Sequence, residues 1–102
     1  MRIAGETLVL PSGQPLTLHE FGEDDVPAIF AIDKRASSFP WTQQNFLDSV
    51  FSSHLCVGVK DESRWCAHAV FSLVAGEAEL LILAVDPDYQ GKKIASELLT
   101  HM

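Results

Sequence analysis

Apolar residues alternate with other residues along two consecutive stretches near the middle of the chain. Leu55, Val57 and Val59 form the first series, and the same alternation runs through the odd positions of residues 65–73. A period of two is typical of a β-strand whose alternate side chains face a core. Residues 60–64, KDESR, interrupt the pattern with polar and charged side chains. We therefore predict two strands joined by a hairpin loop of these five residues.

A third strand is predicted over residues 78–85, where the sequence AELLILAV is almost continuously apolar. Such a run is typical of a strand that is buried on both faces, and residues 75–77 would form the turn before it. Near the N-terminus, the turn cluster PSGQP separates two further apolar stretches, residues 7–10 and 16–21. These stretches predict either a hairpin, or an N-terminal arm within residues 1–15 followed by a strand.

The spacing of apolar residues becomes helical between the N-terminal and central strands. Val26, Ile29 and Ile32 form a stripe on one face of a helix, and the acidic residues before them favour a helix N-terminus. Pro40 ends this pattern, because a proline disfavours helix at the residue before it. Thr42 then fits the N-cap of a second, shorter helix.

The segment AVDPDYQGKKIASELL, residues 84–99, joins the end of the third strand to the start of another helix. Helix N-termini bind phosphates, because their first N–H groups lack partners and the helix macrodipole is positive there. Gly91 spares a side chain in the turn, and two lysines add positive charge. The segment therefore predicts a pyrophosphate cradle, although an ordinary strand–turn–helix with exposed lysines would fit the same residues.

The 102 residues are enough for one domain, residues 1–102, and the apolar content of 47% is that of a folded protein. Seven basic against fourteen acidic residues give a net charge of −7, which disfavours nucleic acids and anionic membranes as partners. A cationic partner such as a basic peptide would suit this charge. Without a signal peptide or a long apolar run, and with two cysteines only, the chain is expected to be cytoplasmic.

The turn within residues 84–99, called the phosphate turn below, resembles the acetyl-CoA-binding motif of the GNAT superfamily of N-acetyltransferases. This motif is commonly written Q/R-x-x-G-x-G/A. Gln90 takes its first position and Ala95 its last, with VDP immediately upstream. The segment IDKRASSFPWTQQNF is similar to the first helix and following loop of the ribosomal-protein-alanine N-acetyltransferases, or RimI-like enzymes. The resemblance covers roughly residues 16–102. It implies a mixed α/β (α+β) fold with a mainly antiparallel sheet and flanking helices, of which this chain holds the N-terminal part.

The resemblance also implies a function, acetyl transfer from acetyl-CoA to the α-amine of a protein N-terminus, and a set of site residues. The strand before the turn would bind the pantetheine arm, the turn's backbone N–H groups would bind the pyrophosphate, and the FPW loop would line the entry for the acceptor peptide. The residues concerned are Leu83, Ala84 and Val85 for the arm, Gln90, Gly91, Lys92, Lys93, Ile94, Ala95 and Ser96 for the pyrophosphate, and Phe39 and Trp41 for the acceptor. A core anchor is the alternative for both aromatic residues.

Two departures from the family pattern matter. Lys93 replaces the motif's internal glycine, so a Cβ occupies room beside the phosphates. The chain also ends inside the helix that follows the turn, and RimI-like enzymes carry their catalytic base and tyrosine acid beyond that point. Tyr89 lies in the phosphate turn and is not that acid. Glu79 or Asp86 could serve as a base, but a solvated carboxylate is expected at both, so the catalytic residues are unknown.

A zinc site in the central hairpin is one interpretation of its histidines and cysteines. His54, Cys56, Cys66 and His68 all occupy even positions, so one face of the two strands could carry them together. Their i,i+2 spacing is not that of the usual zinc knuckle. We expect no metal there, and we expect these residues to pack under the helix that begins near Ile94.

Two alternatives to an active acetyltransferase remain open from the sequence. The chain could be a catalytically incomplete half-domain that binds CoA, or that self-associates through the open strand edge at residues 78–85. It could also be a truncated product without a function of its own.

Overall fold

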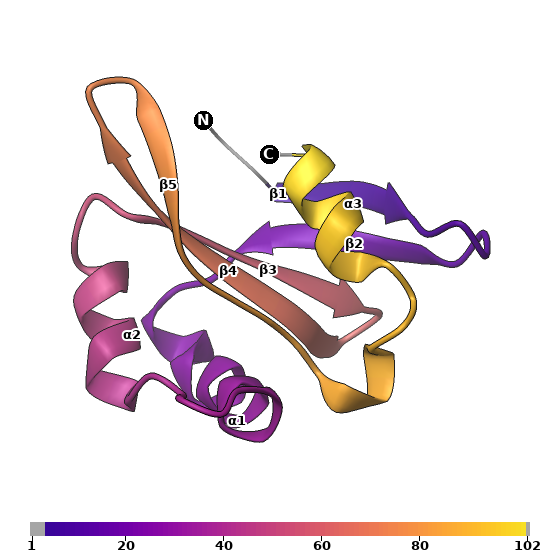
Figure 1. The fold of residues 1–102 in the computed structure, drawn as a ribbon, viewed down its shortest axis with the longest axis horizontal. Helices are drawn as coiled ribbons and strands as arrows, with labels where there is room; N and C mark the ends of the chain where they lie inside the picture. Colours follow the sequence, from indigo (N-terminus) through magenta and orange to yellow (C-terminus); the bar gives the residue numbers. More distant parts are fainter. Residues whose placement is uncertain (1–3, 102) are drawn as a thin grey trace.

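The computed structural model describes residues 4–101, which build one antiparallel sheet with three helices packed around it (Figure 1). Each strand pairs with its neighbours in sequence, so the spatial order is β1-β2-β3-β4-β5. The strands are β1 (Ala4–Val9), β2 (Pro15–Glu20), β3 (Leu55–Asp61), β4 (Arg64–Val74) and β5 (Glu77–Val85). The predicted mixed α/β (α+β) fold with a mainly antiparallel sheet is confirmed.

The helices lie between β2 and β3 and after β5. They are α1 (Val26–Ala36), α2 (Gln43–Val50) and α3 (Ile94–His101), with short 3-10 turns η1 (Glu23–Asp25) and η2 (Pro87–Tyr89). The Thr42 hydroxyl accepts a hydrogen bond from the Asn45 amide at 3.0 Å, which confirms the predicted N-cap of α2. No helix among the residues described has the length and apolar character needed to cross a membrane.

Two buried clusters lie on opposite faces of the sheet. Leu98 of α3 packs into one cluster together with Val57 of β3. Ile29 of α1 and Phe46 of α2 pack into the other, together with Cys56, the neighbour of Val57 in the same strand. Because adjacent strand residues point to opposite faces, α3 covers one side of the sheet and the α1–α2 pair covers the other.

The N-terminal stretch forms the predicted hairpin, and the arm alternative is not observed within the residues described. β1 pairs with β2 in antiparallel register, and the turn between them is closed by a hydrogen bond from the Gly13 amide to the Leu10 carbonyl at 2.8 Å. Residues 1–3 of the predicted arm lie outside the described residues.

The loop between β3 and β4 is shorter than the predicted five residues. Lys60 and Asp61 belong to β3 and Arg64 to β4, so only Glu62 and Ser63 form the turn. Polar composition suggested a loop, but antiparallel pairing of Lys60 with Trp65 and of Asp61 with Arg64 carries both strands to the end of the hairpin.

A β-bulge in β4 also corrects the predicted period of two. Val59 pairs with Ala67 and Lys60 pairs with Trp65, so Cys66 is the extra residue between them. Cys66 therefore joins Ala67 in the cluster under α3, and Trp65 packs against the cluster under α1 and α2 instead. The sequence pattern alone placed Trp65 and Ala67 on the same face.

The bulge also separates the residues considered for zinc. Cys56 belongs to the cluster under α1 and α2, whereas Cys66 belongs to the cluster under α3. The expectation that all four residues pack under α3 is therefore wrong except for Cys66. Over residues 4–101, no group of three or more His, Cys, Asp or Glu side chains is arranged to hold a metal ion.

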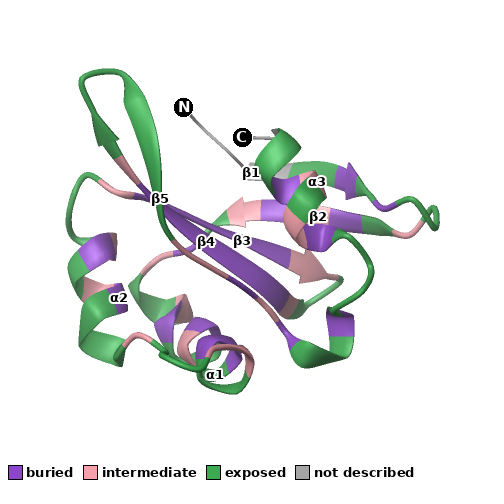
Figure 2. Ribbon diagram, in the orientation of Figure 1, coloured by how far each residue is buried: buried purple, intermediate pink, exposed green. Residues whose placement is uncertain are grey.

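β5 is buried only in its second half, which corrects the prediction of a strand covered on both faces. Residues 77–81 are exposed and form the end of a hairpin that projects beyond the helices, drawn green in Figure 2. Ile82, Leu83 and Val85 are half-buried and Ala84 is buried. Within the described part of the chain, β5 pairs with β4 alone, so its other edge is free.

Candidate functional site

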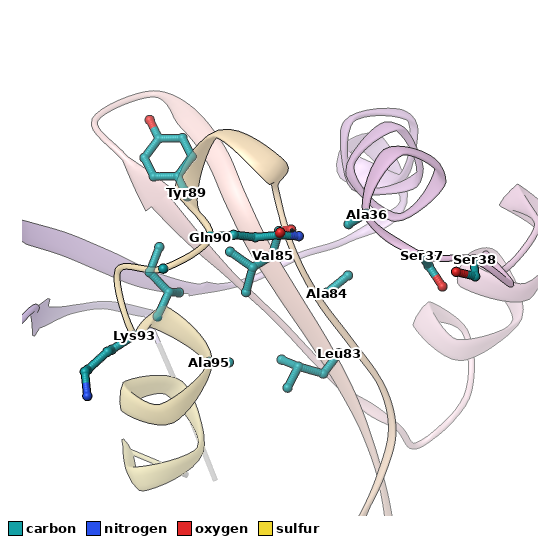
Figure 3. A pocket seen from close by; sticks show the side chains of 12 residues that line it. Ala36, Ser37, Ser38, Leu83, Ala84, Val85, Tyr89, Gln90, Lys93 and Ala95 are labelled. Atoms are coloured by element: carbon teal, nitrogen blue, oxygen red, sulfur yellow. Dashed lines mark hydrogen bonds between the residues drawn. The ribbon is translucent and has the colours of Figure 1, made fainter.

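A groove of about 750 Å³ lies where the end of α1, the second half of β5 and the start of α3 meet (Figure 3). The groove is lined by residues from these three segments and from the turn between β5 and α3. They are Ala36, Ser37, Ser38, Leu83, Ala84, Val85, Tyr89, Gln90, Gly91, Lys93, Ile94 and Ala95. Most of the predicted cofactor-binding residues are in this set.

β5 forms the floor of the groove between the two helix ends. Leu83 and Val85 pack against the cluster under α3, and Ala84 points to the opposite face of the sheet. Figure 3 shows these three residues between the α3 start, with Lys93 and Ala95, and the α1 end, with Ser37 and Ser38. Because the outer edge of β5 is free, its backbone can add hydrogen bonds to an extended ligand in the way a sheet adds a strand.

The turn before α3 lines the groove with Gln90, Gly91 and Lys93. Gly91 has φ +84° and Lys93 has φ +66°, so the chain reverses sharply before α3 begins at Ile94. A Cβ at Gly91 would meet no atom within 4 Å, which leaves open space beside the turn. Ile94 and Leu98 are buried and fix α3 on the sheet. The first N–H groups of α3 lack helical acceptors by geometry, so the start of the helix attracts anions.

Lys92 and Ser96, the other two predicted cofactor-binding residues, do not line this groove. Lys92 borders a smaller hollow of about 250 Å³ with Pro11 and Ser12 of the β1–β2 turn. Ser96 is an exposed residue in the first turn of α3. Lys93 borders both hollows, and its amine points away from the β5 floor in Figure 3.

The two aromatic residues predicted to line the acceptor entry lie differently. Phe39 is 90% exposed, so it anchors no core. Trp41 is half-buried and packs on Phe46, with ring centroids 5.1 Å apart, as the core alternative expects. Neither residue lines the groove, but Ser37 and Ser38 of the same loop do.

Asp86, at the end of β5, is a buried carboxylate with several partners, and the expectation of a solvated side chain is corrected. Its side chain is 1% exposed, and it forms ion pairs with Arg35 of α1 and, at 3.4 Å, with Arg64 of β4. The carboxylate also accepts a hydrogen bond from the Asp88 amide at 2.9 Å, which caps η2. These bonds hold the ends of α1 and β5 together, so Asp86 has a structural role.

Tyr89 is likewise held in place rather than free to act as an acid. Its hydroxyl donates to the Asp61 carboxylate at 2.8 Å, and this hydrogen bond is the main reason that the tyrosine pKa is raised above its ordinary value. The Arg64 guanidinium stacks over the ring at 5.1 Å. Glu79 is exposed and lies away from the groove, beside the β4–β5 turn.

A buried pair behind the groove wall was not anticipated from the sequence. Asp33 of α1 and His68 of β4 are both 0% exposed, and the Asp33 carboxylate lies 3.1 Å from His68 Nε2. The other carboxylate oxygen of Asp33 accepts from the Trp41 amide at 2.7 Å. No local sequence pattern predicts this pair. A polar residue in a helix is most often exposed, so Asp33 gave no sign of being buried against a residue of β4.

Comparison with known proteins identifies relatives of this chain. Residues 20–102 match the acetyltransferase (GNAT) family. The [ribosomal protein bS18]-alanine N-acetyltransferase of Escherichia coli strain K12 is 33% identical over 86 residues, covering 84% of this chain and 58% of the relative. The corresponding protein of Haemophilus ducreyi is 31% identical over 78 residues and covers 76% of this chain and 54% of the relative. The chain thus spans little more than half the length of these relatives.

Solved structures show the same arrangement of elements. The crystal structure of the Escherichia coli ribosomal-protein-S18-alanine N-acetyltransferase has a TM-score of 0.79 at 32% identity, covering 84% of this chain and 56% of that one. A PaiA N-acetyltransferase from Thermoplasma acidophilum, in complex with coenzyme A, has a TM-score of 0.70 at 16% identity, over 84% of this chain and 69% of its own. The latter likeness concerns the fold alone.

Proposed function

Because this chain belongs to the acetyltransferase (GNAT) family, we propose that its groove binds acetyl-CoA and that the protein transfers the acetyl group to the α-amine of a protein N-terminus. One observation carries the proposal. One groove is lined both by residues 83–85 at the free edge of β5 and by the turn before α3. The resemblance to the family motif assigns these two segments to the two parts of CoA.

The residues present fit the two parts of this ligand. The pantetheine arm carries amides, and residues 83–85 offer an extended backbone at a free sheet edge. The pyrophosphate is an anion, and residues 90–96 include the start of a helix and the positive charge of Lys93. Gly91 in the same segment has open space beside its Cα. Lys92 would add charge from the neighbouring hollow.

The proposed reaction is a direct transfer. A general base removes a proton from the acceptor ammonium or amine, and the amine nitrogen attacks the thioester carbonyl carbon. The carbon–sulfur bond breaks, the acetyl group remains on the nitrogen as an amide, and the thiolate of CoA takes up a proton. We assign neither the base nor the acid to a residue of this chain, since Asp86 and Tyr89 are engaged in structural bonds.

The acceptor side of the groove is formed by the loop after α1. Ser37 and Ser38 line it, and the exposed ring of Phe39 lies next to them. The net charge of −7 favours a basic acceptor peptide. The relatives are named for the alanine of a ribosomal protein, and we propose a protein N-terminus of that kind here. We expect the reaction to take place in the cytoplasm, where both free cysteines would stay reduced.

Calorimetric titration with acetyl-CoA tests the proposal. We expect saturable binding by the wild-type chain. Ser96→Glu, which adds a negative charge beside the proposed pyrophosphate position, should weaken binding about tenfold or more. Thr100→Glu adds the same charge one turn further along α3 and should change the affinity by less than about threefold. A glutamate in the first turn stabilises a helix, so weaker binding by Ser96→Glu would not reflect unfolding. Absence of saturable binding, or equal effects of both variants, would contradict the proposal.

A binding-class function is the second candidate, and the free edge of β5 favours it. An unpaired strand edge with exposed apolar residues, such as Leu80 and Leu81, is a template for pairing with another chain. In this case the protein would bind CoA or self-associate without turnover. An acetyl-transfer assay with N-terminal peptides separates the two candidates, because only the first requires acetylated product.

A further inference from the structure

Asp33 has a buried carboxyl group near the groove that the proposed reaction does not use. Its side chain is 0% exposed, and each of its two oxygens has its own partner. Oδ2 accepts from the Trp41 amide at 2.7 Å, and Oδ1 lies 3.1 Å from Nε2 of His68. A carboxylate is buried in this way only where such bonds compensate for its lost hydration, so the geometry around it is tightly constrained.

Asp33 holds the loop between α1 and α2 at both ends. Its backbone carbonyl accepts from the Ser37 amide at 2.9 Å, where the loop begins. Its side chain accepts from the Trp41 amide, where the loop ends. Ser37 and Ser38, between these two points, line the groove. The helical backbone bond holds the start of this wall, and the Asp33 side chain holds its end at Trp41.

The second bond of Asp33 ties the same wall to the floor of the groove. His68 is buried in β4 and is the register partner of Ala84 in β5, which lines the groove. When Asp33 is ionised its oxygens can only accept, and His68 Nε2 is then the donor of this hydrogen bond. Among residues 4–101, Nδ1 of His68 has no hydrogen-bond partner, and the ring packs edge-on against Phe46 at 5.3 Å. Within this part of the chain, Asp33 is thus the one polar side chain that holds the imidazole.

We propose that Asp33 is a positioning residue for the acceptor-side wall of the groove, which it sets at residues 37–41 through the Trp41 amide and aligns with β5 through His68. It lines no part of the groove itself, so it acts through the loop. That this wall is the side that meets the acceptor rests on the proposed function. The positioning of the loop itself can be measured without any ligand.

Amide hydrogen exchange, followed residue by residue by NMR on the full chain, tests the positioning. In Asp33→Ala, exchange at Trp41 should become at least about tenfold faster, since a hydrogen bond to a charged group is lost. Asp33→Asn keeps a carbonyl oxygen for the Trp41 amide and should restore much of the protection. Asp48→Ala removes an exposed carboxylate from α2 and should leave Trp41 unchanged.

The distribution of the effect separates positioning from a general structural role. We expect faster exchange to be confined to the loop of residues 37–42, with the core amides of α1 and β4 changed less than about threefold. Uniformly faster exchange across the sheet, or no change at Trp41, would overturn the proposal. If Asp33→Ala does not fold, Asp33→Leu, which fills about the same space without an acceptor, is compared with Asp48→Leu in the same way.

Acetyl-CoA and peptide measurements then connect the wall with function. In Asp33→Ala the KM for an acceptor peptide should rise about fivefold or more, with a smaller change in kcat and in the acetyl-CoA affinity, and Asp33→Asn should restore most of the wild-type KM. A fall in kcat with unchanged peptide KM would overturn the role at the acceptor side. If the wild-type chain binds no acetyl-CoA while Trp41 exchange still responds to Asp33, the proposed function fails and the positioning of the wall stands.

Discussion

Lys93, at the position where the family motif has a glycine, has a backbone conformation that favours glycine. Its φ of +66° lies in the left-handed region, which costs a residue with a Cβ roughly 1–2 kcal/mol. Glycine would remove this cost but would lose about 0.5–1 kcal/mol to its freedom in the unfolded chain. We therefore expect Lys93→Gly to raise the free energy of unfolding by up to about 1 kcal/mol, measured by urea denaturation.

Lys93→Ala is the control for this prediction, because it removes the amine but keeps a Cβ at positive φ. Its free energy of unfolding should stay within about 0.5 kcal/mol of the wild type. Both variants lack the charge, so Lys93→Gly should bind acetyl-CoA more tightly than Lys93→Ala if a Cβ crowds the phosphates. Equal stability and equal affinity of the two variants would show that backbone strain at this position has no consequence.

The two cysteines give the stability of the protein a dependence on alkaline pH. Burial raises the pKa of Cys56 to about 11 and the pKa of Cys66 to about 12. In the unfolded chain a thiol loses its proton near pH 8.5, so above that pH the unfolded state binds fewer protons than the folded state. The free energy of unfolding should therefore be fully retained below about pH 8 and should fall as the pH rises toward 11.

Urea unfolding at pH 7 and pH 10 measures this effect, and the Cys56→Ala/Cys66→Ala double variant is its control. Tyr89 and the lysines titrate in the same range, so the difference in slope between wild type and double variant isolates the thiols. The same raised pKa values predict slow reaction of a thiol reagent with the native protein at pH 8, and fast reaction in urea. Rapid modification of both cysteines in the native state would contradict their burial.

At the scale of the elements, the turn of the β4–β5 hairpin has a backbone conformation that disfavours one of its two residues, Ala75. Ala75 has φ +52° and Gly76 has φ +80°, and two positive φ values in a two-residue turn are typical of type I′, which prefers Asn-Gly. We expect Ala75→Asn to raise the free energy of unfolding by about 0.5–1 kcal/mol and Ala75→Val to lower it, because β-branched residues tolerate positive φ poorly. Thermal unfolding followed by circular dichroism would detect both signs, and a stabilising valine would refute the turn assignment.

The existence of the elements could be predicted from the sequence because local patterns determine them. The stripe of Val26, Ile29 and Ile32 predicted α1, and Thr42 predicted the start of α2. Register could not be predicted in this way. The bulge at Cys66 reverses the faces of Trp65 and its neighbours, and it depends on pairing across the sheet, which no local period records.

At the scale of the whole molecule, the site could likewise be predicted only where its residues are close in sequence. The motif from Gln90 to Ala95 could be recognised from the sequence because its residues are contiguous, and it supplies five of the twelve residues that line the groove. The contacts beside the groove join residues distant in sequence, as in the hydrogen bond between Asp33 and His68 and the ion pair between Arg35 and Asp86. Such pairs are visible only once the fold places them together.

The free edge that β5 has in this chain predicts how two copies of the chain interact. Two copies can pair their β5 strands in antiparallel fashion around a two-fold axis, which satisfies both edges at once. We expect the average mass in sedimentation experiments to rise with protein concentration. Leu81→Lys, which adds a charge to the edge strand, should weaken association about tenfold or more. Leu99→Lys makes the same change on α3, at a residue of similar exposure, and should have little effect.

This association should compete with ligand binding, since residues 83–85 belong to both the free edge and the groove. An extended ligand that bonds to the β5 backbone removes part of the template on which a second copy would pair. Saturating acetyl-CoA should therefore shift the wild-type protein toward monomer, and by mass action higher protein concentration should weaken the apparent acetyl-CoA affinity. A protein that stays monomeric at every concentration would refute the pairing. A dimer indifferent to acetyl-CoA would place its interface on residues 77–81 alone, outside the groove.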